Sequence, residues 1–149
     1  HANLGYALAS QGKVDEAIEH FQEALGLDPA HVNAHNNLGL ALLKQGKLTD
    51  SIEHLQRAVR IKPDSPEIHA NLGFALARQG RLEAAIKRYQ QALALKPSFS
   101  EVHNNLGLVL MSEGKLPEAI NHFRQALQIR PNFSQARSNL EAALSQKDK

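Results

Sequence analysis

Residues 35–63 read HNNLGLALLKQGKLTDSIEHLQRAVRIKP, and residues 103–131 read HNNLGLVLMSEGKLPEAINHFRQALQIRP. The two stretches share one spacing, and the rest of the chain keeps it. Glycines recur every 34 residues, at Gly12, Gly46, Gly80 and Gly114, and prolines do the same, at Pro29, Pro63, Pro97 and Pro131. A fixed period of this length predicts an array of repeated supersecondary units.

Each unit is predicted to be a pair of amphipathic helices. Val32 to Gln45 carries apolar residues at helical spacing and stops at Gly46, and Thr49 to Ile61 does the same before Pro63. A glycine after one helix and a proline after the next are typical helix stop signals. The pattern therefore predicts stacked, antiparallel helix-turn-helix units.

Glycines inside the first helices suggest how the two helices of a unit pack. A leucine row, Leu4, Leu38, Leu72, Leu106 and Leu140, is followed directly by Gly5, Gly39, Gly73 and Gly107. A glycine inside a helix costs about 1 kcal/mol relative to alanine, so the row indicates a close helix crossing. Small residues of the second helices are expected opposite it: Ala17, Ser51, Ala85 and Ala119. A bulky row is expected to fill the space between hairpins: Phe21, Leu55, Tyr89 and Phe123.

The leucine-glycine pair, the alanines and aromatics of the second helix and the closing proline together resemble the tetratricopeptide repeat (TPR) family. The resemblance covers nearly the whole chain. It implies an all-α fold, an α-solenoid coiled as a right-handed superhelix, whose first helices line a concave groove. The expected division of this single array is 1–31 (a repeat truncated at its start), 32–65, 66–99, 100–133, and a capping helix with a polar tail at 134–149, the tail beginning at Ser145. Because the chain begins at His1, we expect a piece of a longer array, and cellular location stays open.

A row of asparagines carries the strongest functional signal. Each member precedes a leucine of the leucine row: Asn3, Asn37, Asn71, Asn105 and Asn139. Asparagine is unfavourable inside helices, so helix propensity does not explain the row. Its amide offers donors and an acceptor, which match a peptide unit. The row resembles the asparagine ladder in the TPR superhelix of O-linked N-acetylglucosamine transferase, which implies a grip on the backbone of an extended peptide. A structural bond to the neighbouring helix is the alternative.

An apolar strip lies beside this row at helical spacing. Tyr6, Leu40, Phe74 and Leu108 come three residues later, and Met111 lies one turn further on. We therefore predict a peptide-binding groove made of the asparagine row and these five residues. The predicted function is a protein interaction scaffold that binds an extended peptide or a partner protein. Two alternatives stay open: self-assembly through exposed terminal helices, and a docking arm of a larger enzyme such as a glycosyltransferase.

Nothing in the sequence predicts catalysis, a cofactor or a metal. The chain has no Walker loop, G-x-G-x-x-G, nucleophile elbow or H-E-x-x-H. Its histidines form two rows that follow the period, His1, His35, His69 and His103, and His20, His54 and His122. Neighbours within a row lie one repeat apart, roughly 10 Å, too far to share a zinc ion. A metal site would require the two rows to converge, and we expect none.

Composition narrows the partners further. The chain is 42% hydrophobic and 5% aromatic and has no cysteine, so disulfides and thiolate metal sites are excluded. No apolar run is long enough to span a bilayer, and we expect no membrane partner. Basic residues are spread over several faces and exposed aromatics are scarce, so nucleic acid is not expected either. Residues 1–31 hold one base and five acids, whereas 32–65 hold five bases and three acids.

Overall fold

The computed structural model describes residues 1–149 as nine helices with no strand. They are α1 (Ala2–Ser10), α2 (Val14–Leu27), α3 (Val32–Lys44), α4 (Leu48–Ile61), α5 (Pro66–Arg78), α6 (Leu82–Leu95), α7 (Ser100–Ser112), α8 (Leu116–Ile129) and α9 (Ser134–Lys147). The predicted bounds of α3 and α4 agree within one residue. The helix pattern in the sequence was therefore sufficient to place the elements.

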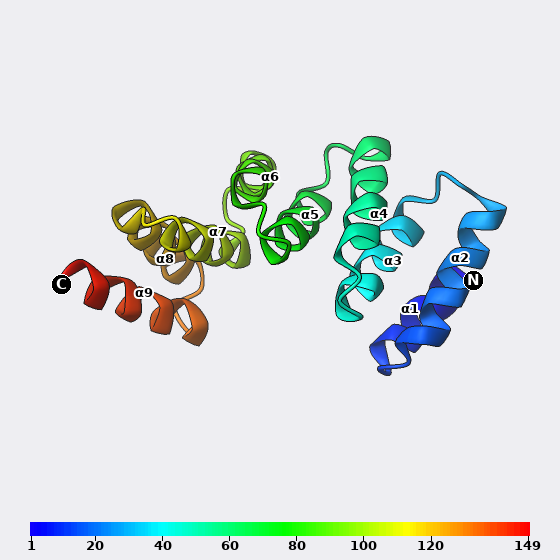
Figure 1. Ribbon diagram of the computed structural model, residues 1–149, viewed down its shortest axis with the longest axis horizontal. Helices are drawn as coiled ribbons and strands as arrows, with labels where there is room; N and C mark the ends of the chain where they lie inside the picture. Colours follow the sequence, from blue (N-terminus) through cyan, green and yellow to red (C-terminus); the bar gives the residue numbers. More distant parts are fainter.

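The helices form hairpins that stack side by side into an α-solenoid (Figure 1). Each hairpin pairs an odd-numbered helix with the even-numbered helix that follows, and α9 packs on both α7 and α8. The two ends of the chain lie at opposite ends of the array (Figure 1). Successive odd-numbered helices contact one another, α1 with α3, α3 with α5 and α5 with α7, so they form one continuous surface.

A glycine ends the first helix of each hairpin for a conformational reason. Gly46 has φ +76°, in the left-handed region that side chains rarely adopt, and the equivalent glycines do the same. Beyond it, the Lys47 N–H donates to the Leu42 carbonyl at 3.0 Å. This bond is the Schellman closure, which satisfies a carbonyl that the helix end would otherwise leave free.

The glycines inside the first helices make room for the bulky row. A Cβ added at Gly73 would lie 2.8 Å from Cε1 of Tyr89, and one at Gly39 would lie 2.7 Å from Cγ of Leu55. Tyr89 and Leu55 are both buried. The predicted close crossing is therefore confirmed. The expectation for the bulky row was incomplete, since each member packs on the glycine of its own hairpin.

The last helix extends beyond its expected end. The pattern placed a polar tail from Ser145 onward, but α9 continues to Lys147. Ala136 and Ala143 are its buried residues, and Leu140 and Leu144 pack half-buried against the core. No helix in the structure combines the length and the hydropathy that a membrane crossing requires.

Candidate functional site

The concave surface contains an apolar pocket of about 430 Å³ between α1, α3 and α5. Tyr6 and Phe74 form two of its walls, and their side chains are 62% and 40% exposed. Leu40 lies half-buried between them. The remaining lining is Ala9, Ser10, Val14, Phe21, Asn37, Ala41, Leu43, Lys44 and Arg78. Large exposed apolar side chains in one hollow offer a place for an apolar side chain of a ligand.

A second pocket continues this groove toward the C-terminal repeats. Its volume is about 200 Å³, and its apolar lining consists of Phe74, Ala77, Leu82, Leu108 and Val109. Phe74 and Arg78 line both pockets, and Cζ of Arg78 lies 6.0 Å from the centroid of the Phe74 ring. The groove therefore runs from α1 to α7, and Phe74 divides it.

The structure brings some of the predicted groove residues together and leaves others apart. Tyr6, Asn37, Leu40 and Phe74 share the larger pocket, and Leu108 joins Phe74 in the smaller one. Met111 packs half-buried against the core and lines neither of these pockets. The other members of the asparagine row also lie outside both: Asn3, Asn71, Asn105 and Asn139.

The asparagine row divides into bonded and unbonded members. Asn71 Nδ2 donates to Asn36 Oδ1 at 2.9 Å, and Asn139 Nδ2 donates to Asn104 Oδ1 at 2.8 Å. Both bonds join the first helix of one repeat to that of the repeat before. Asn37 accepts a long 3.3 Å bond from its neighbour Asn36, which leaves its Nδ2 without a partner. Asn3 and Asn105 make no side-chain hydrogen bond at all.

The cause of this division lies one residue before the row. The two inter-repeat bonds span 35 residues, so the partner is the residue that precedes the equivalent asparagine of the earlier repeat. That residue is Asn36 or Asn104 for the bonded pair, but alanine, Ala2 or Ala70, for Asn37 and Asn105. The asparagine doublets at 36–37 and 104–105 were the signal in the sequence, and alignment at 34 residues overlooked it.

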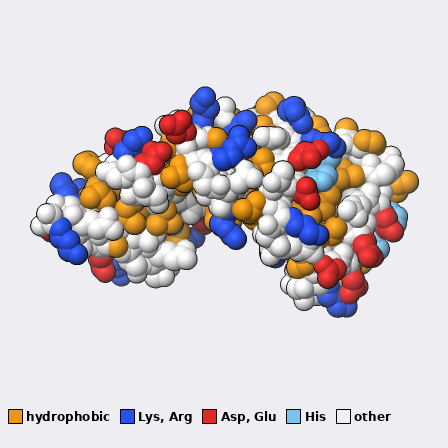
Figure 2. All heavy atoms as spheres, in the orientation of Figure 1, with side chains coloured by type: hydrophobic (Ala, Val, Ile, Leu, Met, Phe, Trp, Pro, Cys, Tyr) orange, Lys and Arg blue, Asp and Glu red, His pale blue; other side chains and the backbone are white.

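Two basic residues on the rim of the larger pocket were also missed as site residues. Lys44 and Arg78 occupy one row of the groove surface, and Ser10 and Ser112 are their equivalents in the outer repeats. Both are exposed, and neither takes part in an ion pair. Acidic side chains gather instead at the end of the array that holds α1 and α2 (Figure 2). The middle of the groove is therefore positively charged and unneutralised.

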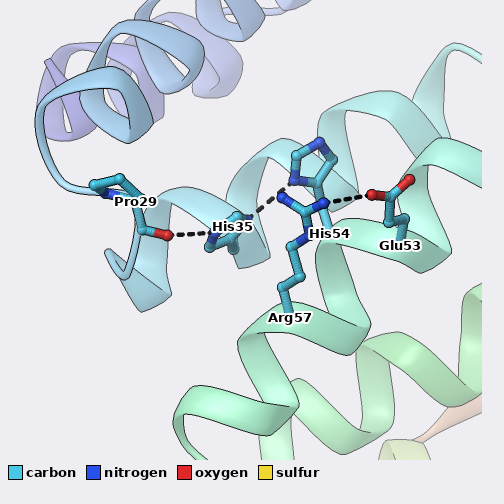
Figure 3. A network of polar contacts seen from close by, with 5 residues as sticks. All are labelled: Pro29, His35, Glu53, His54 and Arg57. Carbon is cyan, nitrogen blue, oxygen red and sulfur yellow. Dashed lines mark hydrogen bonds and ion pairs between the residues drawn. The ribbon is translucent and has the colours of Figure 1, made fainter.

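The two histidine rows converge, contrary to the separation that the sequence suggested. His35 Nδ1 lies 3.0 Å from His54 Nδ1, and His35 Nε2 lies 2.9 Å from the Pro29 carbonyl oxygen (Figure 3). A carbonyl only accepts, so Nε2 of His35 carries the hydrogen and its Nδ1 accepts from His54. His103, His122 and Pro97 repeat this arrangement.

The second histidine of each pair disfavours protonation. Burial lowers the pKa of His54, and the neighbouring His35 and Arg57 lower it further. Burial likewise lowers the pKa of His122, with His103 as the second cause. Two protonated rings would set hydrogen against hydrogen across 3.0 Å. The pairs therefore join the two helices of a hairpin through one hydrogen bond between the rings, with the preceding loop bonded to the first ring.

The fold and the two pockets together define the chain as a helical-hairpin solenoid whose first helices carry apolar hollows. Family models described as tetratricopeptide repeat match residues 3–66, 54–87 and 100–133, and one described as TPR repeat matches 75–112. The chain belongs to the tetratricopeptide repeat family. Members of this family are in general non-enzymatic modules for protein interaction, and the chain is accordingly an interaction scaffold.

Solved structures show the same architecture. MamA is 29% identical with a TM-score of 0.90, and the match covers 99% of this chain and 86% of MamA. PilF of Pseudomonas aeruginosa is 25% identical with a TM-score of 0.91, covering 99% of this chain and 67% of PilF. YrrB, described as a TPR protein with an unusual peptide-binding site, shares the fold at 22% identity and TM-score 0.82, covering 99% of this chain and 76% of YrrB. The comparison with curated proteins gives no match.

Proposed function

We propose that the chain binds an extended segment of a partner protein along the concave groove from α1 to α7. The observation that carries the proposal is the 430 Å³ pocket, in which exposed Tyr6 and Phe74 face an asparagine with a free amide. Exposed aromatic side chains in a hollow are costly in water and favour an apolar occupant. The description of YrrB as peptide-binding supports the same use of this fold.

The chemistry of the groove describes the ligand. An aromatic or large aliphatic side chain would fill the pocket between Tyr6, Leu40 and Phe74. Asn37 and Asn105 would bond the ligand backbone, because their amides are not committed to a neighbouring repeat. Lys44 and Arg78 add a requirement for acidic residues beside the anchor, since no carboxylate of the chain neutralises them. The ligand class is thus an extended acidic peptide with an apolar anchor.

A peptide array tests this proposal, with captured peptides then titrated in solution. Phe74→Ala should weaken binding about ten-fold, since loss of part of a buried aromatic contact costs on the order of 1.4 kcal/mol. Leu95→Ala is the matched control, because Leu95 is similarly exposed, at 45% against 40% for Phe74, but lies on α6, outside the groove. Arg78→Gln should weaken binding of acidic peptides mainly at low salt. Equal losses for the Phe74 and Leu95 variants would contradict the proposed site.

Self-assembly is the second candidate, and one observation favours it. Leu4 is 51% exposed, whereas its equivalents Leu38, Leu72 and Leu106 are at most 2% exposed beneath the preceding hairpin. A second copy of the chain could cover the face of α1 that carries Leu4. Light scattering over a range of concentrations tests this, and a strict monomer at high concentration would remove it. A docking arm of a larger enzyme would use the peptide groove itself, so it differs from the first proposal only in the adjoining domain.

A further inference from the structure

Three potential metal ligands meet at the outer edge of the first repeat. His1 Nδ1 lies 2.6 Å and His20 Nδ1 2.9 Å from the same oxygen, Oε2 of Glu23. The rings of His1 and His20 are stacked, with centroids 5.9 Å apart and planes at 24°. All three ligand atoms lie within 4.8 Å of one another. We propose that these residues bind one divalent transition-metal ion, with zinc as the reference ligand.

The first repeat differs from the second and fourth at the position of Glu23, three residues after the histidine of the second helix. In the second repeat, Arg57 occupies the place of Glu23, three residues after the histidine, and points its charge at Glu53 (Figure 3). In the fourth repeat this place is Gln125. The histidine pairs of those repeats therefore have no carboxylate at this position, and the cation at Arg57 would repel a metal ion. Only the first repeat combines two imidazoles with a carboxylate.

The donor atoms of the first repeat are also available. His35 and His103 each hold a proline carbonyl through Nε2 and their partner ring through Nδ1. His1 instead directs Nδ1 toward the carboxylate that His20 also contacts. Each imidazole can keep its hydrogen on Nε2 and offer Nδ1 as a lone pair, the neutral form that metals require.

The geometry suits a tetrahedral ion. With zinc bonds to nitrogen and oxygen of about 2.0–2.2 Å, donor atoms stand about 3.3 Å apart. The two separations, 2.6 and 2.9 Å, fall below this value, and the exposed side chains of His1 and Glu23 can open by the difference. Water would complete the four ligands. The ion would tie the start of α1 to the second half of α2, where a single shared carboxylate oxygen now joins them.

Calorimetric titration of the protein with zinc chloride at neutral pH tests the site. We expect one saturable site per chain. Loss of a residue that only hydrogen-bonds to a metal ligand lowers metal affinity about 10–100-fold. Glu23→Gln or His20→Ala removes a ligand itself and should lower the zinc affinity by at least as much. His54→Ala serves as the control, because it removes the equivalent histidine of a repeat that lacks the carboxylate. Circular dichroism should check that each variant remains folded. Glu23→Gln should not affect folding, because the side chain of Glu23 is 52% exposed.

Two results would overturn the proposal. One is the absence of saturable zinc binding below millimolar concentration. The other is binding that survives both Glu23→Gln and His20→Ala, which would place the ion elsewhere in the chain.

Discussion

The split of the asparagine row gives the sharpest test of what the row does. Asn71 is bonded to the preceding repeat and Asn105 is not. Asn71→Ala removes a half-buried bond worth about 0.5–1.5 kcal/mol and gains up to about 0.7 kcal/mol in helix propensity. Asn105→Ala gains the propensity and loses no internal bond. The two variants should therefore differ by about 1 kcal/mol in the free energy of unfolding, with Asn105→Ala the more stable.

Peptide binding should change in the opposite order. A ligand amide bonded to Asn105 contributes about 1 kcal/mol, so Asn105→Ala should weaken binding about five-fold. Asn71 has already committed its Nδ2 to Asn36 at 2.9 Å, and its replacement should weaken binding less. A purely structural row would show no binding loss at either position beyond what instability causes.

Urea unfolding and peptide titration measure the two effects. Asn36→Ala is the internal control, because it removes the bond of Asn71 from the other side. Apart from the long 3.3 Å bond to Asn37 that it also loses, it should reproduce the stability change of Asn71→Ala. The double variant should show a coupling near the value of one hydrogen bond. Equal stability changes at Asn71 and Asn105, or a greater binding loss at Asn71, would refute the division of the row.

Three further predictions concern the scaffold. Gly73→Ala should lower the free energy of unfolding in urea by about 1–2 kcal/mol, because the cost of overpacking against Tyr89 exceeds the gain in helix propensity. Gly26→Ala should leave the free energy of unfolding unchanged or raise it by up to about 1 kcal/mol, because a Cβ at Gly26 would have nothing within 4 Å. Tyr89→Ala should cost about 3–5 kcal/mol, and Tyr89→Phe far less, because phenylalanine occupies the same place in two other repeats. Unfolding at a series of pH values should show stability held above about pH 6.5 and lost below it, because the folded state lowers the pKa of His54 and His122 and the unfolded state then takes up more protons. Replacing both histidines with glutamine should flatten that dependence.

The repeat period predicted nearly everything that depends on local sequence. Helix bounds, the glycine turns and the glycine row inside the first helices all follow from interactions within one hairpin, so a single repeat contains the information. The inter-repeat bonds do not. Asn71 meets Asn36 and not Asn37, because stacked first helices are offset by one residue from the sequence period. Such an offset arises from superhelical packing, and alignment of the rows conceals it.

The metal prediction shows a related limit. Spacing within one histidine row was the right distance argument, and the sequence allowed a metal site only where the two rows converge, which the repeat period alone does not reveal. The hairpin brings His1 beside His20 and His35 beside His54, which are 19 residues apart in the chain. Whether such a pair can bind a metal ion depends on the residue three positions after its second histidine. Glu23 and Arg57 give opposite charges there. The same histidine pair thus has different chemistry in different repeats, because one neighbouring residue differs between them.

The groove also depends on residues that differ between repeats, and these residues alternate along the array. The first and third repeats place an aromatic residue on the concave surface, Tyr6 and Phe74, while the second and fourth place leucine there. The asparagine doublets occur in the two repeats that have leucine at this position and are absent from the two that have an aromatic residue. Because the larger pocket needs Tyr6, Leu40 and Phe74 together, no single repeat contains it. The unit that a ligand meets is therefore larger than the unit that folds, and exchanging one repeat for its neighbour would keep the solenoid while removing the pocket.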